Sequence, residues 1–184
     1  KILVDWNGLM IAAFSLGARI LNKPEYARAA EKSAQFILTK MRDGRGRMFH
    51  RFRDGELAVE AQAADYAFLI YGLLNLYQAT FNLTYAEEAA AFQEKMLQDF
   101  WDPDNGGFFS TANESKALPV RPKELYDGAI PSANSVSLLN LLWLSRLTGN
   151  PKWDNHARDL LRAFGGTLKA QPTAFAFFLL GVDF

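Results

Sequence analysis

The chain has 184 residues, enough for one domain with a substantial core. Hydrophobic residues make up 49% of it and aromatic residues 14%, which excludes a disordered or low-complexity chain. Lysine plus arginine equals aspartate plus glutamate at 20 each, so no overall charge attracts nucleic acid or an anionic membrane surface. The chain has no cysteine, which excludes disulfides, zinc–thiolate sites and a thiol nucleophile.

The first residues indicate a piece of a longer protein. Residues 1–5 contain no initiating methionine and run directly into a helical pattern, so we expect further segments of the same protein before them. The longest apolar runs, residues 68–74 and 138–144, are too short to cross a bilayer. We therefore expect no membrane partner, and the absence of cysteine fits a cytoplasmic location.

One helix–turn–helix signature occurs three times along the chain. Each copy has a helix breaker, then proline or threonine for a first helical turn, then an aromatic residue: Tyr26, Tyr85 or Trp153. Beyond each aromatic residue the apolar positions recur with the period of one buried stripe on a helix. In chain order the pattern predicts helices at residues 6–21, 24–41, 62–80, 84–101, 132–148, 151–166 and 173–182.

The repeat also predicts how these helices are arranged. The segments before each signature, residues 8–21, 66–77 and 136–147, are apolar on all sides, which is typical of buried inner helices. Each would pair with an amphipathic outer helix, and stacked hairpins of this kind curve into a ring. We therefore predict an all-α fold, an α/α-toroid, with residues 1–184 as a single domain that supplies about half of a six-hairpin ring.

Polar residues mark the starts of the inner helices. Asp5, Asp65 and Ser132 occupy equivalent positions ahead of the three marker aromatic residues. Aspartate and serine are favoured N-caps, and capping alone would explain them. Because inner-helix N-termini converge toward the ring axis, the same residues could instead face a ligand. Both interpretations stay open.

The long loops reach the same end of the predicted ring. Residues 43–57 alternate aromatic and basic side chains between glycines and predict a small β-hairpin that carries His50. Residues 101–109 form a turn before an aromatic pair, and residues 120–134 combine arginine, lysine, tyrosine and aspartate. Such sets fit sugars, whose faces stack on rings and whose hydroxyls need polar partners. The alternative is that Phe108 only seals its loop onto the core.

These positions give the candidate site. The catalytic candidates are the carboxylates Asp5, Asp65 and Asp127, two of which could form an acid/base pair. We expect one of them to pair with Arg121 or Lys123, and we expect Asp127→Ala to abolish ligand binding at little cost in stability. No metal-binding or cofactor motif occurs, so neither is predicted. The ligand-binding candidates are Trp6, Asn7, His50, Tyr66, Phe108, Arg121, Lys123, Tyr126, Ser132 and Asn134.

Five ordered strings carry a family resemblance: VDWNGLMI (4–11), DYAFLI (65–70), Trp101 with GGFF (106–109), VRPK (120–123) and YDGAIPSANS (126–135). Nearly the whole chain resembles the C-terminal region of the YyaL-type, spermatogenesis-associated thioredoxin-like family. The resemblance implies a toroid similar to six-hairpin glycosidases and N-acylglucosamine 2-epimerases. It also implies two partners within the same protein, an N-terminal thioredoxin-like domain and the remaining hairpins.

Two functions remain open. The first is a ligand- or substrate-recognition module, with a cleft for a sugar or other small molecule and no activity of its own. The second is a carbohydrate-active enzyme that uses paired aspartates. Half a ring would also leave apolar sides of inner helices without neighbours, so we expect the fragment alone to self-associate.

Overall fold

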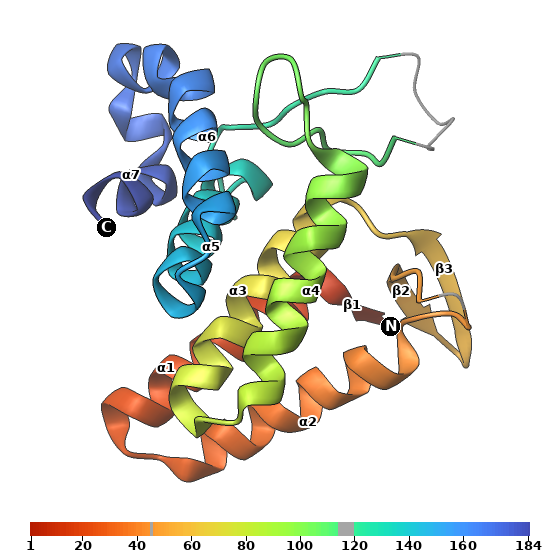
Figure 1. The fold of residues 1–184 in the computed structure, drawn as a ribbon. Coiled ribbons are helices and arrows are strands. Elements are labelled where there is room, and N and C mark those ends of the chain that lie inside the picture. The colour runs from red at the N-terminus through yellow and green to blue at the C-terminus, as the bar shows by residue number, and fades with distance from the viewer. Residues whose placement is uncertain (45, 114–119) are drawn as a thin grey trace. The chain divides into compact units, whose positions relative to one another are not determined.

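The computed structural model describes residues 1–44, 46–113 and 120–184 (Figure 1). Within them the seven predicted helices are present, and each end lies within four residues of its predicted position. In chain order they are α1 (Val4–Leu21), α2 (Pro24–Lys40), α3 (Ala63–Thr80), α4 (Leu83–Phe100), α5 (Ala133–Thr148), α6 (Pro151–Ala170) and α7 (Ala176–Asp183). A short 3-10 helix, η1 (Pro172–Ala174), lies between α6 and α7.

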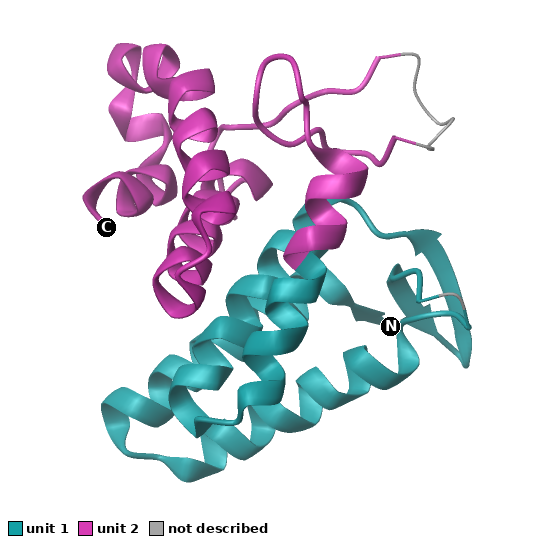
Figure 2. Ribbon diagram, viewed as in Figure 1, with its two compact units in different colours: residues 1–92 teal, residues 93–184 magenta. Residues whose placement is uncertain are grey.

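The chain divides into two compact units, residues 1–92 and residues 93–184 (Figure 2). The boundary falls inside α4. Unit 1 holds the first helical hairpin, the β-strands and α3, and unit 2 holds α5, α6 and α7. The single domain predicted for residues 1–184 stays a prediction.

The three tight turns of the hairpins are built in the same way. Each preceding helix ends at a residue in the left-handed conformation, namely Asn22 (φ 52°), Phe81 (φ 56°) and Gly149 (φ 66°). The N–H of each donates to the carbonyl oxygen four residues earlier, which satisfies one free acceptor of the helix end. Asparagine and glycine favour this conformation, which explains why two of the three predicted breakers stop their helices.

Burial follows the predicted division into inner and outer helices. In α3 nearly every residue from Asp65 to Leu76 is buried, as expected for an inner helix. The outer helix α4 buries only a stripe, and that stripe is the predicted one. Its buried apolar members are Tyr85, Ala89, Phe92, Met96 and Phe100, and the polar side chain of Gln93 is buried beside them.

Two glycines bring the backbones of α1 and α3 into contact. A Cβ atom added at Gly8 would lie 2.5 Å from the carbonyl carbon of Phe68, and one at Gly72 would lie 2.6 Å from the carbonyl oxygen of Gly8. No other residue type fits there without moving a helix. This packing fixes the start of α1 against the first turns of α3.

A small antiparallel sheet closes the same end of unit 1. Its strands are β1 (Ile2–Leu3), β2 (Phe49–Arg53) and β3 (Glu56–Glu60), in the order β1-β2-β3. The predicted hairpin therefore exists but starts later than residue 43, because its turn is Asp54–Gly55 (φ 53° and 87°). Residue 45 of the predicted segment lies outside the described residues. Strand β1 was not predicted, because two residues are too few to show an alternating pattern.

The last helices differ most from the prediction. Helix α6 continues four residues beyond residue 166, because Leu168 extends its buried stripe past two glycines. Helix α7 accordingly begins at Ala176, three residues late. None of the described helices is both long and apolar enough to cross a membrane.

Candidate functional site

The start of α3 holds the first candidate, Asp65, in a capping box. Gln62 is the N-cap, and its side chain accepts a hydrogen bond from the backbone N–H of Asp65. In return Oδ2 of Asp65 accepts from the backbone N–H of Gln62 at 2.8 Å. Asp65 therefore occupies the third helical position. It is not the N-cap residue itself, but its carboxylate takes part in capping the helix start, which agrees with the capping interpretation. The sequence feature that could have indicated this capping box is a polar residue, Gln62, three residues before an aspartate.

The second oxygen of Asp65 brings two other elements to this helix start. Oδ1 accepts from the backbone N–H of Asp5 at 3.1 Å and lies 2.8 Å from Nδ1 of His50. Asp5 belongs to the first turn of α1, and His50 belongs to β2. The ligating atoms of the three side chains all lie within 4.8 Å of one another. Three residues predicted from separate motifs thus form one cluster, which we call the Asp5–His50–Asp65 cluster.

Burial sets the electrostatics of this cluster. The Asp65 side chain is 1% exposed, and this burial raises the pKa of its carboxyl above the usual value. The hydrogen bond from Gln62 and the neighbouring His50 ring lower the pKa again in part, and the nearby Asp5 raises it. When Asp65 is ionised it accepts the proton of Nδ1, so a neutral His50 presents the lone pair of Nε2. The His50 side chain is 27% exposed.

Asp5 is the half-buried carboxylate of the cluster. The N-cap of α1 is Leu3, which makes no side-chain cap bond, so Asp5 is not the N-cap, one of the two interpretations left open for it. Oδ1 of Asp5 accepts a hydrogen bond from the adjacent backbone N–H of Trp6 at 2.7 Å. Within the described residues Asp5 forms no ion pair. Trp6 beside it is 61% exposed.

Two further candidates of unit 1 have their polar groups engaged or covered. Asn7 donates to the carbonyl oxygen of Leu3 at 2.7 Å and accepts from Ser33 Oγ at 3.1 Å, so it ties α1 to α2. The Tyr66 ring is 5% exposed and packs edge-on against Phe92, with ring centroids 5.9 Å apart. Neither residue offers a free polar atom to a ligand in this conformation.

Asp127 in unit 2 caps a helix from a distance. Its Oδ2 accepts from the backbone N–H groups of Phe177 and Phe178, at 2.8 and 3.2 Å, in the first turn of α7. Its Oδ1 accepts from the backbone N–H of Ser132 at 2.8 Å. Backbone N–H groups therefore take both oxygens of Asp127. The expected ion pair of Asp5, Asp65 or Asp127 with Arg121 or Lys123 was wrong, because none of the three carboxylates pairs with either cation in the described residues.

The two cations are used elsewhere in unit 2. Nζ of Lys123 lies 2.6 Å from Oδ2 of Asp102, a buried carboxylate that the sequence interpretation missed. Lys123 is the main reason that the pKa of Asp102 lies well below its usual value. The guanidinium of Arg121 lies 4.1 Å from the centre of the Phe109 ring and donates to the Thr111 carbonyl oxygen. The segment 101–109 also contains Asp104, and nothing in the sequence indicates that Asp102 is the aspartate that pairs with a lysine.

Asn134 locks two loops onto α5. Its Oδ1 accepts from the Phe108 N–H at 2.7 Å, and its Nδ2 donates to the carbonyl oxygens of Phe108 and Glu124 at 3.0 and 2.7 Å. Ser132 is the N-cap of α5 and accepts from Ser135, which confirms its predicted capping role. Phe108 is 1% exposed, which agrees with the alternative that it seals its loop onto the core. Tyr126 remains exposed.

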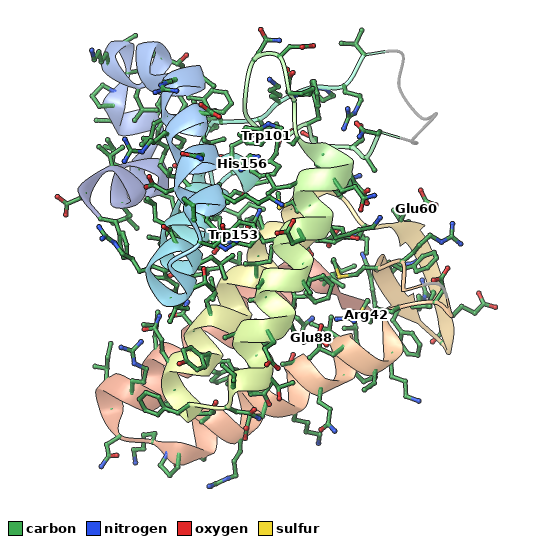
Figure 3. The ribbon with its side chains drawn as sticks, in the orientation of Figure 1. Arg42, Glu60, Glu88, Trp101, Trp153 and His156 are labelled. Carbon is green, nitrogen blue, oxygen red and sulfur yellow. The ribbon has the colours of Figure 1, made fainter. Side chains whose placement is uncertain are left out.

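His156, outside the candidate site, has a structural role. Its Nδ1 lies 2.8 Å from the carbonyl oxygen of Lys152, and its ring packs edge-on against Trp101 at 4.9 Å (Figure 3). Among the predicted residues that the structure describes, only the Asp5–His50–Asp65 cluster therefore joins polar side chains from separate elements and leaves two of them, Asp5 and His50, partly exposed. It contains ligand types for a divalent ion, but both oxygens of Asp65 already accept hydrogen bonds. The absence of a metal and of a cofactor stays a prediction.

Comparison with solved structures identifies the fold. The chain is similar to an α-mannanase of glycoside hydrolase family 76 from Bacteroides thetaiotaomicron, with a TM-score of 0.73 and 14% identity over 91% of this chain and 46% of that chain. It is also similar to cellobiose 2-epimerase from Spirochaeta thermophila, with a TM-score of 0.66 and 21% identity over 88% of this chain and 42% of that chain. At these identities the likeness shows the fold alone, and it confirms the predicted α/α-toroid class.

Comparison of sequences identifies the relatives. Spermatogenesis-associated protein 20 of Mus musculus is 36% identical over 184 residues, covering 95% of this chain and 23% of that protein. This confirms the resemblance, and the chain spans about a quarter of the length of the curated relatives it matches. The model of the family described as N-acylglucosamine 2-epimerase (GlcNAc 2-epimerase) matches residues 6–173. The chain therefore belongs to the N-acylglucosamine 2-epimerase family.

Proposed function

We propose that residues 1–184 are the sugar-recognition part of a longer protein and that the Asp5–His50–Asp65 cluster is the recognition site. The observation that carries this proposal is the 2.8 Å contact of His50 with Asp65 beside the carboxylate of Asp5, which forms no ion pair with any described residue. Asp65 would hold the imidazole ring of His50 in place. The carboxylate of Asp5 and Nε2 of His50 would accept hydrogen bonds from sugar hydroxyls. The exposed indole of Trp6 would add an apolar face for the sugar ring.

The family gives this proposal its ligand class. The family is named for an epimerase of an N-acylated sugar, and the two structural neighbours are named as a mannanase and a cellobiose epimerase. We therefore propose a neutral sugar as the ligand. We also propose that the longer protein includes the thioredoxin-like domain implied by the resemblance, along with the other hairpins of the ring.

A binding role fits the geometry better than hydrolysis by paired aspartates. Asp65 is buried with both oxygens bonded, and Asp127 is held by three backbone N–H groups. Neither is free to take part in the two-carboxylate chemistry of glycosidases. One observation favours a second candidate, a carbohydrate-active enzyme of the isomerase or epimerase type. A His50 ring held by a carboxylate at Nδ1 has the arrangement of a general base.

The test uses saturation-transfer NMR on the intact protein with N-acetylglucosamine, mannose and cellobiose as probes. We expect at least one sugar to bind, and Asp5→Asn and Trp6→Ala to weaken that binding. Glu25→Gln, at an exposed position of α2, is the matched control and should bind as the parent does. If no sugar binds, or if Asp5→Asn and Trp6→Ala bind normally, the proposed site is wrong. Conversion of the bound sugar that is lost in His50→Gln would establish the second candidate.

A further inference from the structure

The outer helix α2 has a second face that is only partly covered by the described residues. Its buried side consists of Ala30, Ala34 and Ile37, which pack inside unit 1. The other side lines a groove of about 550 Å³ together with Ile2 and Asn7 at the start of α1. The members of α2 in this groove recur at helical spacing and include Ala29, Lys32, Ser33, Phe36 and Lys40.

The chemistry of this groove is specific. Ile2, Ala29 and Phe36 give it an apolar floor, and Phe36 is held there by edge-on packing against Phe52 at 5.3 Å. Lys32 and Lys40 are exposed on the same helix face, about 12 Å apart along the helix. Neither lysine forms an ion pair with any residue that the structure describes. An apolar floor with two uncompensated cations complements a segment that has an apolar face and two carboxylates.

Helix α1, the other helix of this hairpin, also has an exposed apolar side. Met10 is 48% exposed and Ile20 is 76% exposed, and Ala13 between them is exposed as well. These positions recur at intervals of three and seven residues, so they form one apolar stripe along α1. A helical hairpin stacked on the α1–α2 hairpin would cover the exposed sides of both helices. A small anion would cover neither the apolar stripe of α1 nor the apolar floor of the α2 groove.

We propose that the groove along α2 is the docking site of an amphipathic helix from the same protein, outside residues 1–184, whose carboxylates pair with Lys32 and Lys40. This inference rests on the proposal that the chain is part of a longer protein. The lengths of related proteins support this proposal. Residues 1–184 cover only 23% of a curated relative and 46% of a solved toroid, so in both proteins further chain is present that could supply such a helix. The occupant would be a helix of the adjoining hairpin, because hairpins stack on hairpins in this fold.

The test is zero-length carbodiimide cross-linking of the intact protein, followed by mass spectrometry. This reagent joins a lysine to a carboxylate only where the two are in contact. We expect Lys32 and Lys40 to link to aspartate or glutamate outside residues 1–184. The exposed pair Lys152 and Glu94 supplies an internal positive control. A mixture of isotope-labelled and unlabelled protein separates links within one chain from links between two copies.

The outcomes are distinct. The proposal would be overturned if Lys32 and Lys40 link only to residues within 1–184, or only to a second copy of the protein. It would also be overturned if they form no link while the control pair, Lys152 and Glu94, does. Lys32→Glu/Lys40→Glu should abolish the links to those carboxylates and lower the melting temperature of the intact protein, whereas Lys169→Glu, exposed on α6, should change neither. Asp5→Asn should leave the links intact, so loss of sugar binding and loss of docking are separable results.

Discussion

The carboxylate of Asp127 bonds to the backbone of Phe177, 50 residues further along the chain, at 2.8 Å. Phe178 donates to the same oxygen, and the start of α5 donates to the other through Ser132. Helix α7 has no cap of its own, because its N-cap residue is Phe175. One loop aspartate therefore satisfies the free N–H groups at the starts of two helices and joins them.

Asp127→Ala should destabilise the protein by about 2 kcal/mol, because it leaves backbone donors at two helix starts without their charged acceptor. This replaces the expectation that the variant would lose ligand binding and keep its stability. Urea unfolding followed by tryptophan fluorescence measures the difference. Asp159→Ala, which loses only an exposed pair with Arg162, should change the free energy of unfolding by less than about 0.5 kcal/mol. Equal effects of the two variants would contradict the capping role.

A pair of glycines provides a second prediction. Gly8→Ala places a methyl group 2.5 Å from the backbone of Phe68 and should cost about 1–3 kcal/mol or more, since two helices must separate. Gly165→Ala, within α6, meets nothing within 4 Å and should stabilise the protein by about 0.5–1 kcal/mol through helix propensity. Thermal unfolding of both variants shows whether each substitution lowers or raises the stability of the protein. A neutral Gly8→Ala would show that α1 and α3 pack less closely than described.

The helices could be predicted because their signals are local. Each turn places a breaker before an aromatic marker, and the stripe from Tyr85 to Phe100 follows one helical period. Burial on all sides of α3 follows from the lack of a polar face. These features depend on residues within one or two turns of each other, so the sequence alone contains them.

The site could be predicted only in part because its contacts are long-range. Asp65 and His50 were both candidates, but their contact depends on how β2 crosses the start of α3. Asp127 looked like an exposed loop charge because two of its three donors, Phe177 and Phe178, lie 50 and 51 residues away. Asp102 was missed for the same reason, since the pairing with Lys123 joins two loops that no periodic pattern describes.

Acid should weaken the Asp102–Lys123 pair. The pKa of Asp102 is lower in the folded chain than its usual value of 3.8, so in acid the unfolded chain binds the additional proton. The stabilisation is therefore full above pH 3.8 and is lost as the pH falls toward the folded pKa. Urea unfolding at a series of pH values should show this loss in the parent and a flatter profile in Asp102→Asn. Parallel profiles would show that the pair contributes nothing.

Asp65 should titrate in the opposite sense. Burial raises its pKa above 3.8, so the folded chain binds the proton more readily than the unfolded chain. Its contribution to stability is therefore full below pH 3.8 and is lost as the pH rises through the folded pKa. Selective ¹³C labelling of aspartate followed by NMR titration of the intact protein measures that pKa directly.

Two variants should move the pKa of Asp65 in opposite directions. His50→Gln removes a neighbour that lowers this pKa and should raise it further, whereas Asp5→Asn removes a neighbouring negative charge and should lower it. Lys123→Met, which removes contacts with Asp102, Gly106 and Phe109 that all lie in unit 2, is the control and should leave the Asp65 titration unchanged. A midpoint at or below 3.8 in the parent, or shifts of the same sign in both variants, would show that the cluster is not assembled as described. The opposite shifts would place His50 and Asp5 beside one buried carboxylate, the arrangement on which the proposed sugar site depends.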